Sequence, residues 1–224
     1  MEIITTDKKG QLATRALNLQ TISAQTSSDG VTPKKAENLN IWDYSQIFIR
    51  DEYKSLVFAS KKAIKDEIML NTNINKICSW FQQTNRRPWL RIAGYIGNGK
   101  STMLKAVKNW FDKTHQRQMM TFYTANDLVK LAVSDPETFN NVIHRHKWLI
   151  IDDLGTEPNE VVVYGNKMQP VREMFYARYD KKLVTIFTTN LSDAAFSDYY
   201  GERIADRCNE MQQKIIFSQT SYRS

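Results

Sequence analysis

A glycine-rich segment carries the clearest chemistry in this sequence. Residues 94–101 read Gly-Tyr-Ile-Gly-Asn-Gly-Lys-Ser and match the pattern G-x-x-x-x-G-K-[ST] at every specified position. The glycines let successive amides point at phosphate groups, and the positive end of a following helix adds to that attraction. Lys100 is expected to reach the β and γ phosphates, and Ser101 to give its hydroxyl to Mg²⁺. The segment therefore predicts a site for ATP and Mg²⁺ formed by Gly94, Tyr95, Ile96, Gly97, Asn98, Gly99, Lys100, Ser101 and Thr102.

Two adjacent carboxylates follow an apolar run later in the chain, where Trp148 to Ile151 precedes Asp152 and Asp153. A strand that crosses a core tolerates charge only where it emerges, so both acids are expected at the carboxyl edge of a sheet. Asp152 is assigned to Mg²⁺. Asp153 faces elsewhere because side chains alternate along a strand, and it is assigned to orient or deprotonate the attacking water. Alone, such a run could simply end in a loop cap, but about 50 residues after the glycine-rich segment it favours a metal site.

A second apolar run, Leu183 to Thr188, ends in the polar residues Thr189 and Asn190. It should reach the same edge of the sheet, where the Asn190 amide could hold the water or the γ phosphate. Asn190 could also cap a helix that begins near Ser192, and the two roles are compatible.

Arg203 and Arg207 are four residues apart, so they share one face of a predicted helix. A planar guanidinium can enter the site of a neighbouring subunit and offset the γ phosphate charge, a role that requires an oligomer. The alternative is a salt-bridged surface, because Glu202 and Asp206 interleave with the arginines.

These groups need a scaffold, and the chain after Pro88 alternates short apolar runs with helical stretches, as a parallel sheet covered by helices does. The predicted class is therefore α/β. The predicted strands are Trp89–Ala93, Met119–Tyr123, Trp148–Ile151, Leu183–Thr188 and Lys214–Phe217.

The first part of the chain differs in composition. Residues 1–40 are polar and predict a flexible arm, and the apolar cluster within residues 41–48 could dock a partner or pack back on the core. Apolar residues recur at helical spacing from Phe58 to Phe81, which predicts one core-facing helix. We therefore expect an N-terminal arm at 1–57 and an ATPase domain at 58–224.

Composition narrows the class of protein. The chain has 224 residues and a net charge of +7, which favours an anionic partner such as nucleic acid, although a merely basic protein would show the same balance. Its two cysteines, Cys78 and Cys208, have no spacing typical of zinc sites or disulfide frameworks. No stretch has the length of a membrane span, so we expect no membrane partner and a cytoplasmic location.

The motifs occur in the order Gly94–Ser101, Leu149–Gly155, Thr188–Leu191, Gly201–Arg207 and Ser221–Arg223. Together they resemble the DnaC/IstB family of AAA+ ATPases, in particular the DnaC-type loaders of bacteria and phages, over roughly Trp89 to Ser224. The resemblance implies a P-loop NTPase fold of three layers, with a five-stranded parallel sheet in the order 5-1-4-3-2 and no separate C-terminal lid.

The resemblance also implies a function. A protein of this kind would bind a hexameric replicative helicase (DnaB-type) through its N-terminal part, hold single-stranded DNA, self-associate head to tail, and switch state on ATP. Arg207 matches the family's arginine finger, Arg203 is the second candidate, and Arg223 resembles a further sensing arginine. Many relatives carry glutamate where this chain has Asp153, which implies slow hydrolysis.

The segment Ala125 to Lys147 lies where the family inserts a helical hairpin beside a central pore, with helices expected at 127–132 and 139–146. Its basic end, residues 144–147, would suit a phosphate backbone or could simply interact with a helix dipole.

Other functions remain open. A transposition helper of the same family, which binds duplex DNA and a transposase, would carry the same core motifs. A small-molecule P-loop kinase is disfavoured by the Gly201–Arg207 block, and a third alternative is a module that binds ATP without hydrolysing it.

Overall fold

The computed structural model describes residues 41–60, 63–64, 66–114, 120–163 and 165–218, with the backbone alone described at 41–44. The compact unit begins at Ile41. Residues 41–57, expected in an N-terminal arm, lie in a helix of this unit that buries Ile49, Tyr53 and Val57 in the core.

A five-stranded sheet lies at the centre of the unit, in the order β2-β3-β6-β1-β7. All neighbouring pairs are parallel. The predicted order 5-1-4-3-2 is confirmed, because it names the same neighbours from the opposite edge. The strands are β1 (Trp89–Gly94), β2 (Met120–Thr124), β3 (Trp148–Leu154), β6 (Val184–Thr189) and β7 (Gln212–Phe217). A separate antiparallel hairpin, β4 (Val161–Val163) and β5 (Asn166–Met168), was not predicted.

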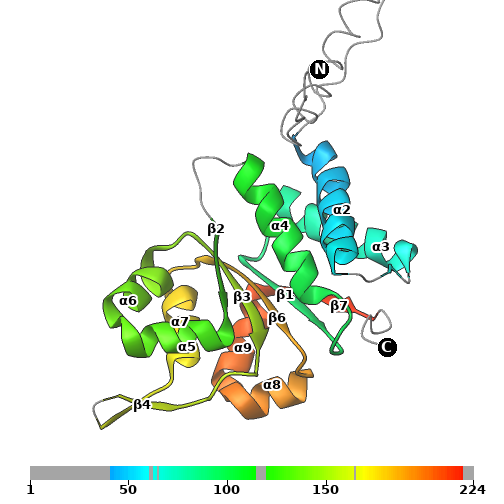
Figure 1. The fold of residues 1–224 in the computed structure, drawn as a ribbon. Coiled ribbons are helices and arrows are strands. Elements are labelled where there is room, and N and C mark those ends of the chain that lie inside the picture. Colours follow the sequence, from blue (N-terminus) through cyan, green and yellow to red (C-terminus); the bar gives the residue numbers. More distant parts are fainter. Residues whose placement is uncertain (1–40, 61–62, 65, 115–119, 164, 219–224) are drawn as a thin grey trace, which may run out of the picture. The chain divides into compact units, whose positions relative to one another are not determined.

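Helices cover both faces of the sheet and complete three layers (Figure 1). One face packs against α2 (Ile41–Ala59), α3 (Glu67–Gln82) and α4 (Lys100–Thr114). The other packs against α5 (Ala125–Ser134), α6 (Pro136–Arg145), α7 (Pro170–Asp180), α8 (Asp193–Tyr200) and α9 (Glu202–Met211).

Alternation along the strands divides the core in two. On β1, Leu90 and Ile92 belong to the cluster under α2, α3 and α4, whereas Trp89 belongs to the cluster on the other face. The apolar character of the strands is therefore explained by burial on both faces.

The prediction of one helix from Phe58 to Phe81 is wrong. Helix α2 ends at Ala59, and α3 begins after Asp66, whose side chain accepts a hydrogen bond from the Met69 amide at 2.8 Å. Ile68, expected in the core, is 81% exposed. The apolar spacing continued across the break, so periodicity alone could not reveal the new N-cap.

The helical hairpin expected between Ala125 and Lys147 is present as α5 and α6. Asp135 ends α5 and also caps α6, since its side chain accepts a hydrogen bond from the Thr138 amide at 3.0 Å. No helix in the described part of the chain has the length and apolar content of a membrane span.

Candidate nucleotide-binding site

A pocket of about 290 Å³ opens at the carboxyl edge of the sheet, where β1 passes through the glycine-rich loop into α4. Three further segments complete its wall: the end of α2, the loop after β3 and the residue after β6. The lining residues are Tyr53, Val57, Ser60, Ile96, Gly97, Asn98, Gly99, Lys100, Ser101, Thr102, Asp153, Thr156 and Asn190. The fold thus brings the predicted loop, one acid and the predicted sensor into one cavity.

The glycine-rich loop has the backbone that phosphate binding requires. Gly97 and Gly99 have φ values of 85° and 86°, which L side chains adopt at a cost. At Gly94 an added Cβ would lie 2.2 Å from the Phe217 carbonyl oxygen, so a larger residue would push the loop away from β7. The backbone amides of this curled loop and of the N-terminus of α4 are donors for phosphate oxygens, so the segment fits a triphosphate.

Lys100 lies inside this loop and is 4% exposed. Its ammonium donates to the Gly94 and Tyr95 carbonyls, both at 2.8 Å, and to Asn98 Oδ1 at 3.1 Å. It also donates to Asn190 Oδ1 at 2.7 Å. Lys100 is the one cation among the pocket-lining residues in the described part of the chain.

Asn98 connects the loop to the end of the sheet. Its side chain is fully buried, and Nδ2 donates to the Phe217 carbonyl at 2.5 Å while Oδ1 accepts from Lys100. Because both ends of the amide are used, Asn98 fixes the loop and orients the Lys100 ammonium.

The two aspartates have different surroundings. Asp152 is 5% exposed and accepts from Thr188 Oγ1 at 2.6 Å, whereas Asp153 lines the pocket. The register of β3 against β6 shifts between Ile151 and Leu154, and Asp153 has a φ of 58°. This irregular strand end turns the Asp153 side chain toward the cavity, as the separate roles assigned to the two acids would require.

The loop after β3 is held by a buried carboxylate. Glu157 Oε2 accepts from the Gly155 amide at 2.8 Å, and Oε1 accepts from the Tyr200 hydroxyl. Burial raises the pKa of Glu157, and the Tyr200 hydrogen bond opposes that rise.

Asn190 contacts Lys100 and leaves helix capping to another residue. The N-cap of α8 is Ser192, whose hydroxyl accepts from the Ala195 amide at 3.2 Å. The structure therefore separates the two roles that the sequence left open for Asn190.

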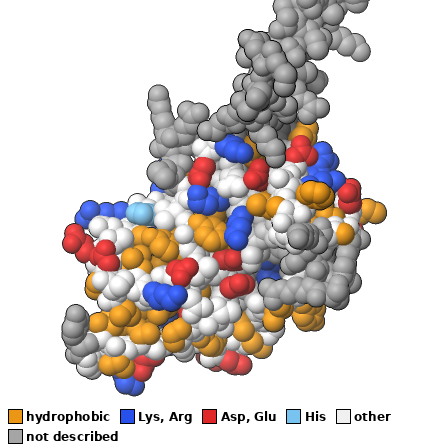
Figure 2. Space-filling model, viewed as in Figure 1, with side chains coloured by type: hydrophobic (Ala, Val, Ile, Leu, Met, Phe, Trp, Pro, Cys, Tyr) orange, Lys and Arg blue, Asp and Glu red, His pale blue; other side chains and the backbone are white. Residues whose placement is uncertain are grey.

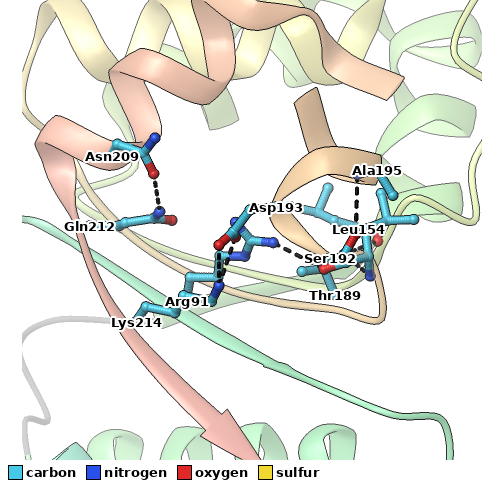
Figure 3. A network of polar contacts seen from close by, with 10 residues as sticks. Arg91, Leu154, Thr189, Ser192, Asp193, Ala195, Asn209, Gln212 and Lys214 are labelled. Atoms are coloured by element: carbon cyan, nitrogen blue, oxygen red, sulfur yellow. Dashed lines mark hydrogen bonds and ion pairs between the residues drawn. The ribbon is translucent and has the colours of Figure 1, made fainter. Parts of the chain in front are cut away.

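Arg91 fixes the chain just beyond Asn190 (Figure 3). It lies on β1, is 2% exposed, and donates to the Leu191 carbonyl at 3.0 Å. It also pairs with Asp193 at 3.0 Å, and Lys214 on β7 reaches the same carboxylate at 2.6 Å. Strands β1 and β7 thus anchor the loop that carries the predicted sensor.

The two candidate finger arginines lie away from this pocket. The Arg207 guanidinium stacks over Tyr176 at 4.7 Å and Tyr179 at 4.5 Å, and Arg203 lies 5.8 Å from the Tyr176 ring. Neither arginine forms an ion pair within the described residues, so the salt-bridged alternative has no support there. Arg223 lies outside the described residues.

Four pocket residues were not predicted from the sequence: Tyr53, Val57, Ser60 and Thr156. Ile49, Tyr53 and Val57 are spaced four residues apart, as on one face of a helix, but no sequence signal shows that α2 packs on α4 beside the loop.

Comparisons with known proteins agree with this fold. No protein-family model matches the chain, and no curated protein matches it by sequence. Among solved structures, a DnaC helicase loader matches with a TM-score of 0.54 at 20% identity, over 69% of this chain and 93% of its own. A DnaI structure matches with a TM-score of 0.54 at 16% identity, over 84% of this chain and 95% of its own. A putative primosome component from Streptococcus pyogenes serotype M3 matches with a TM-score of 0.55 at 16% identity, over 74% of this chain and 87% of its own.

A DnaA from Aquifex aeolicus bound to AMPPCP also matches, with a TM-score of 0.50 at 16% identity, over 71% of this chain and 48% of that one. At these identities the likeness shows the fold, which is the AAA+ P-loop fold expected from the motifs.

Proposed function

We propose that this chain is an ATP-dependent loader that delivers a hexameric replicative helicase to single-stranded DNA. The observation that carries the proposal is the convergence of Lys100, Asp153 and Asn190 on one pocket, within a fold that matches a DnaC helicase loader over 93% of that protein's length. The fold match to a DnaA bound to an ATP analogue supports a triphosphate as the ligand.

The site residues have distinct tasks in this proposal. The amides of residues 97–102 and the Lys100 ammonium bind the β and γ phosphates. Ser101 and Asp152 would hold Mg²⁺, which neutralises phosphate charge when bound. Asp153 accepts the proton of the attacking water, and Asn190 orients that water or the γ phosphate. The Asp153 side chain is shorter than a glutamate and reaches less far toward the water, which favours slow hydrolysis.

A single copy offers one cation to the triphosphate among its described pocket residues. We therefore infer that a second copy, assembled head to tail, supplies Arg207, with Arg203 as the alternative. Stacking on Tyr176 and Tyr179 holds the Arg207 guanidinium in a fixed place before assembly. Arg223 could add a further contact to nucleotide.

Co-purification tests the partner. The tagged full chain is mixed with Mg-ATP and either the replicative helicase or a transposase from the same cells. A loader retains the helicase, and Lys100→Ala weakens that capture. Retention of the transposase alone, with duplex DNA, would instead identify a transposition helper.

Nucleotide binding is tested separately by calorimetry with Mg-ATP. Absence of heat with well-folded wild-type protein would exclude both ATP-dependent functions.

A further inference from the structure

A row of cations lies at the amino edge of the sheet, opposite the edge that holds the pocket. Lys147 directly precedes β3, Lys181 and Lys182 precede β6, and Arg86 and Arg87 precede β1. These three strands are neighbours in the sheet, and β7 lies beside β1. At about 4.8 Å between strands, the edge from β3 to β7 is about 14 Å long.

Contacts between the segments show that the row is continuous. Arg178 donates to the His146 carbonyl at 3.0 Å, which ties the end of α7 to the end of α6. Lys181 reaches the His144 carbonyl at 3.3 Å from the same turn. The Arg86 guanidinium lies 5.2 Å from the centroid of the Trp148 ring, and Trp148 follows Lys147 in the chain.

Most of this edge is exposed and has little compensating charge. Lys147, Lys181, Lys182 and the neighbouring Arg145 are exposed, and none of these four forms an ion pair with a described residue. Arg86 is half-buried against the Trp80 and Trp148 rings. Among residues 83–88, 144–147 and 180–183 the sole carboxylate is Asp180. The nearby Glu210, on α9, accepts from the Tyr179 hydroxyl at 2.7 Å. Figure 2 shows a patch of Lys and Arg beside a His side chain on the left of the molecule, with Asp and Glu side chains just below it.

A polar pocket of about 480 Å³ continues this edge at β1 and β7. It is lined by Gln83, Asn85, Arg87, Asn209, Gln212, Gln213 and Lys214. Gln212 donates to Asn209 Oδ1 at 3.1 Å (Figure 3), while its own buried Oε1 has no hydrogen-bond partner among the described residues. An ordered water or a ligand in this pocket would supply that donor.

The chemistry of this edge favours nucleic acid as its occupant. None of the large apolar side chains exposed in the described residues belongs to these segments, so the surface lacks the anchors typical of protein interfaces and membrane insertion. Cations neutralise backbone phosphates, and carboxamides hydrogen-bond the edges of bases. A strand with a rise of about 3.4 Å per nucleotide presents about four phosphates over 14 Å.

We propose that the amino edge of the sheet binds single-stranded nucleic acid, with backbone phosphates on Arg145, Lys147, Lys181 and Lys182 and a base in the amide-lined pocket. This deepens the proposed function, on which it rests, by placing a DNA contact on the side of the sheet away from ATP.

Anisotropy of a labelled single-stranded oligonucleotide, measured over a series of NaCl concentrations, tests the phosphate contacts. The double variant Lys147→Gln/Lys182→Gln should lose about tenfold in affinity and lower the salt slope by about 1.4, since each phosphate contact of a single strand contributes about 0.7. The matched control Lys76→Gln/Lys105→Gln removes the same charge from exposed positions on α3 and α4 and should bind as wild type. Equal losses in both variants, or no loss in the first, overturn the proposal.

The pocket is tested with Asn85→Ala, which should weaken binding of a normal strand several-fold and leave an abasic strand of equal length unaffected. Equal effects on the two strands contradict a bound base. Binding to anionic vesicles tests a membrane as the alternative partner. If the double variant loses vesicle binding but keeps the wild-type affinity for the oligonucleotide, the proposal is contradicted. The affinity for Mg-ATP, measured by calorimetry, and the capture of helicase should be unchanged in all these variants. Failure of this proposal is therefore distinct from failure of the loader function.

Discussion

The Lys100 ammonium donates to Asn190 Oδ1 at 2.7 Å, across 90 residues of chain. This bond joins the glycine-rich loop after β1 to the residue that follows β6, and the two strands are paired neighbours in the sheet. A γ phosphate that attracts Lys100 would therefore also act on Asn190. The bond gives the proposed sensor a direct means of responding to nucleotide.

Asn190→Ala should leave Mg-ATP affinity within a few-fold of wild type, because most phosphate contacts come from the loop. Hydrolysis should fall by about a hundredfold, since the amide that orients the water or γ phosphate is lost. Calorimetry and steady-state phosphate release measure the two effects. Unchanged hydrolysis would remove Asn190 from the mechanism.

Lys100→Ala and Arg207→Ala proteins should each be nearly inactive alone, while an equimolar mixture recovers part of the wild-type ATPase rate. In the mixture, a copy with intact Lys100 can receive Arg207 from its neighbour. Arg203→Ala in place of Arg207→Ala is the control that distinguishes the two arginines. A mixture that assembles but stays inactive would contradict a finger supplied in trans.

Arg91→Met should lower the ATPase rate more than it lowers ATP affinity, because the buried guanidinium holds Leu191 and Asp193 beside Asn190. The free energy of unfolding should also fall, by about 2 kcal/mol, since charge-assisted bonds to buried groups are lost. Urea unfolding and single-turnover hydrolysis measure these changes. Lys214→Met removes the other partner of Asp193, and both effects should be smaller than in Arg91→Met. Equal effects in the two variants would rule out a special role for Arg91.

Glu157→Gln should flatten the pH dependence of stability. Burial raises the pKa of this carboxyl above 4.5, so the folded state keeps a proton that the unfolded chain has already released. The Glu157 contribution is therefore greatest below pH 4.5, falls as pH rises to the raised folded-state pKa, and is constant above it. Urea unfolding between about pH 4 and pH 8 gives the difference between the two proteins. A constant difference over that range would contradict the raised pKa.

The sequence alone determined the loop at Gly94–Ser101, the five-strand alternation and the order of the motifs. These are local signals, because phosphate binding by backbone amides constrains glycine positions and because strands buried on both faces must be apolar. The order of the strands followed from the family resemblance that those motifs carried.

Tertiary structure decided the rest. Only packing showed that Tyr53 and Val57 of α2, and Ser60 just after it, line the pocket, since contacts between distant segments leave no local pattern. The break at Asp66 escaped prediction for the opposite reason, because apolar spacing persisted across it. The register shift in β3 turned Asp153 toward the cavity, and parallel pairing brought the cations before β3, β6 and β1 to one edge. Residue types set which chemistry is possible, and the hydrogen-bonded register of the sheet determined which groups meet.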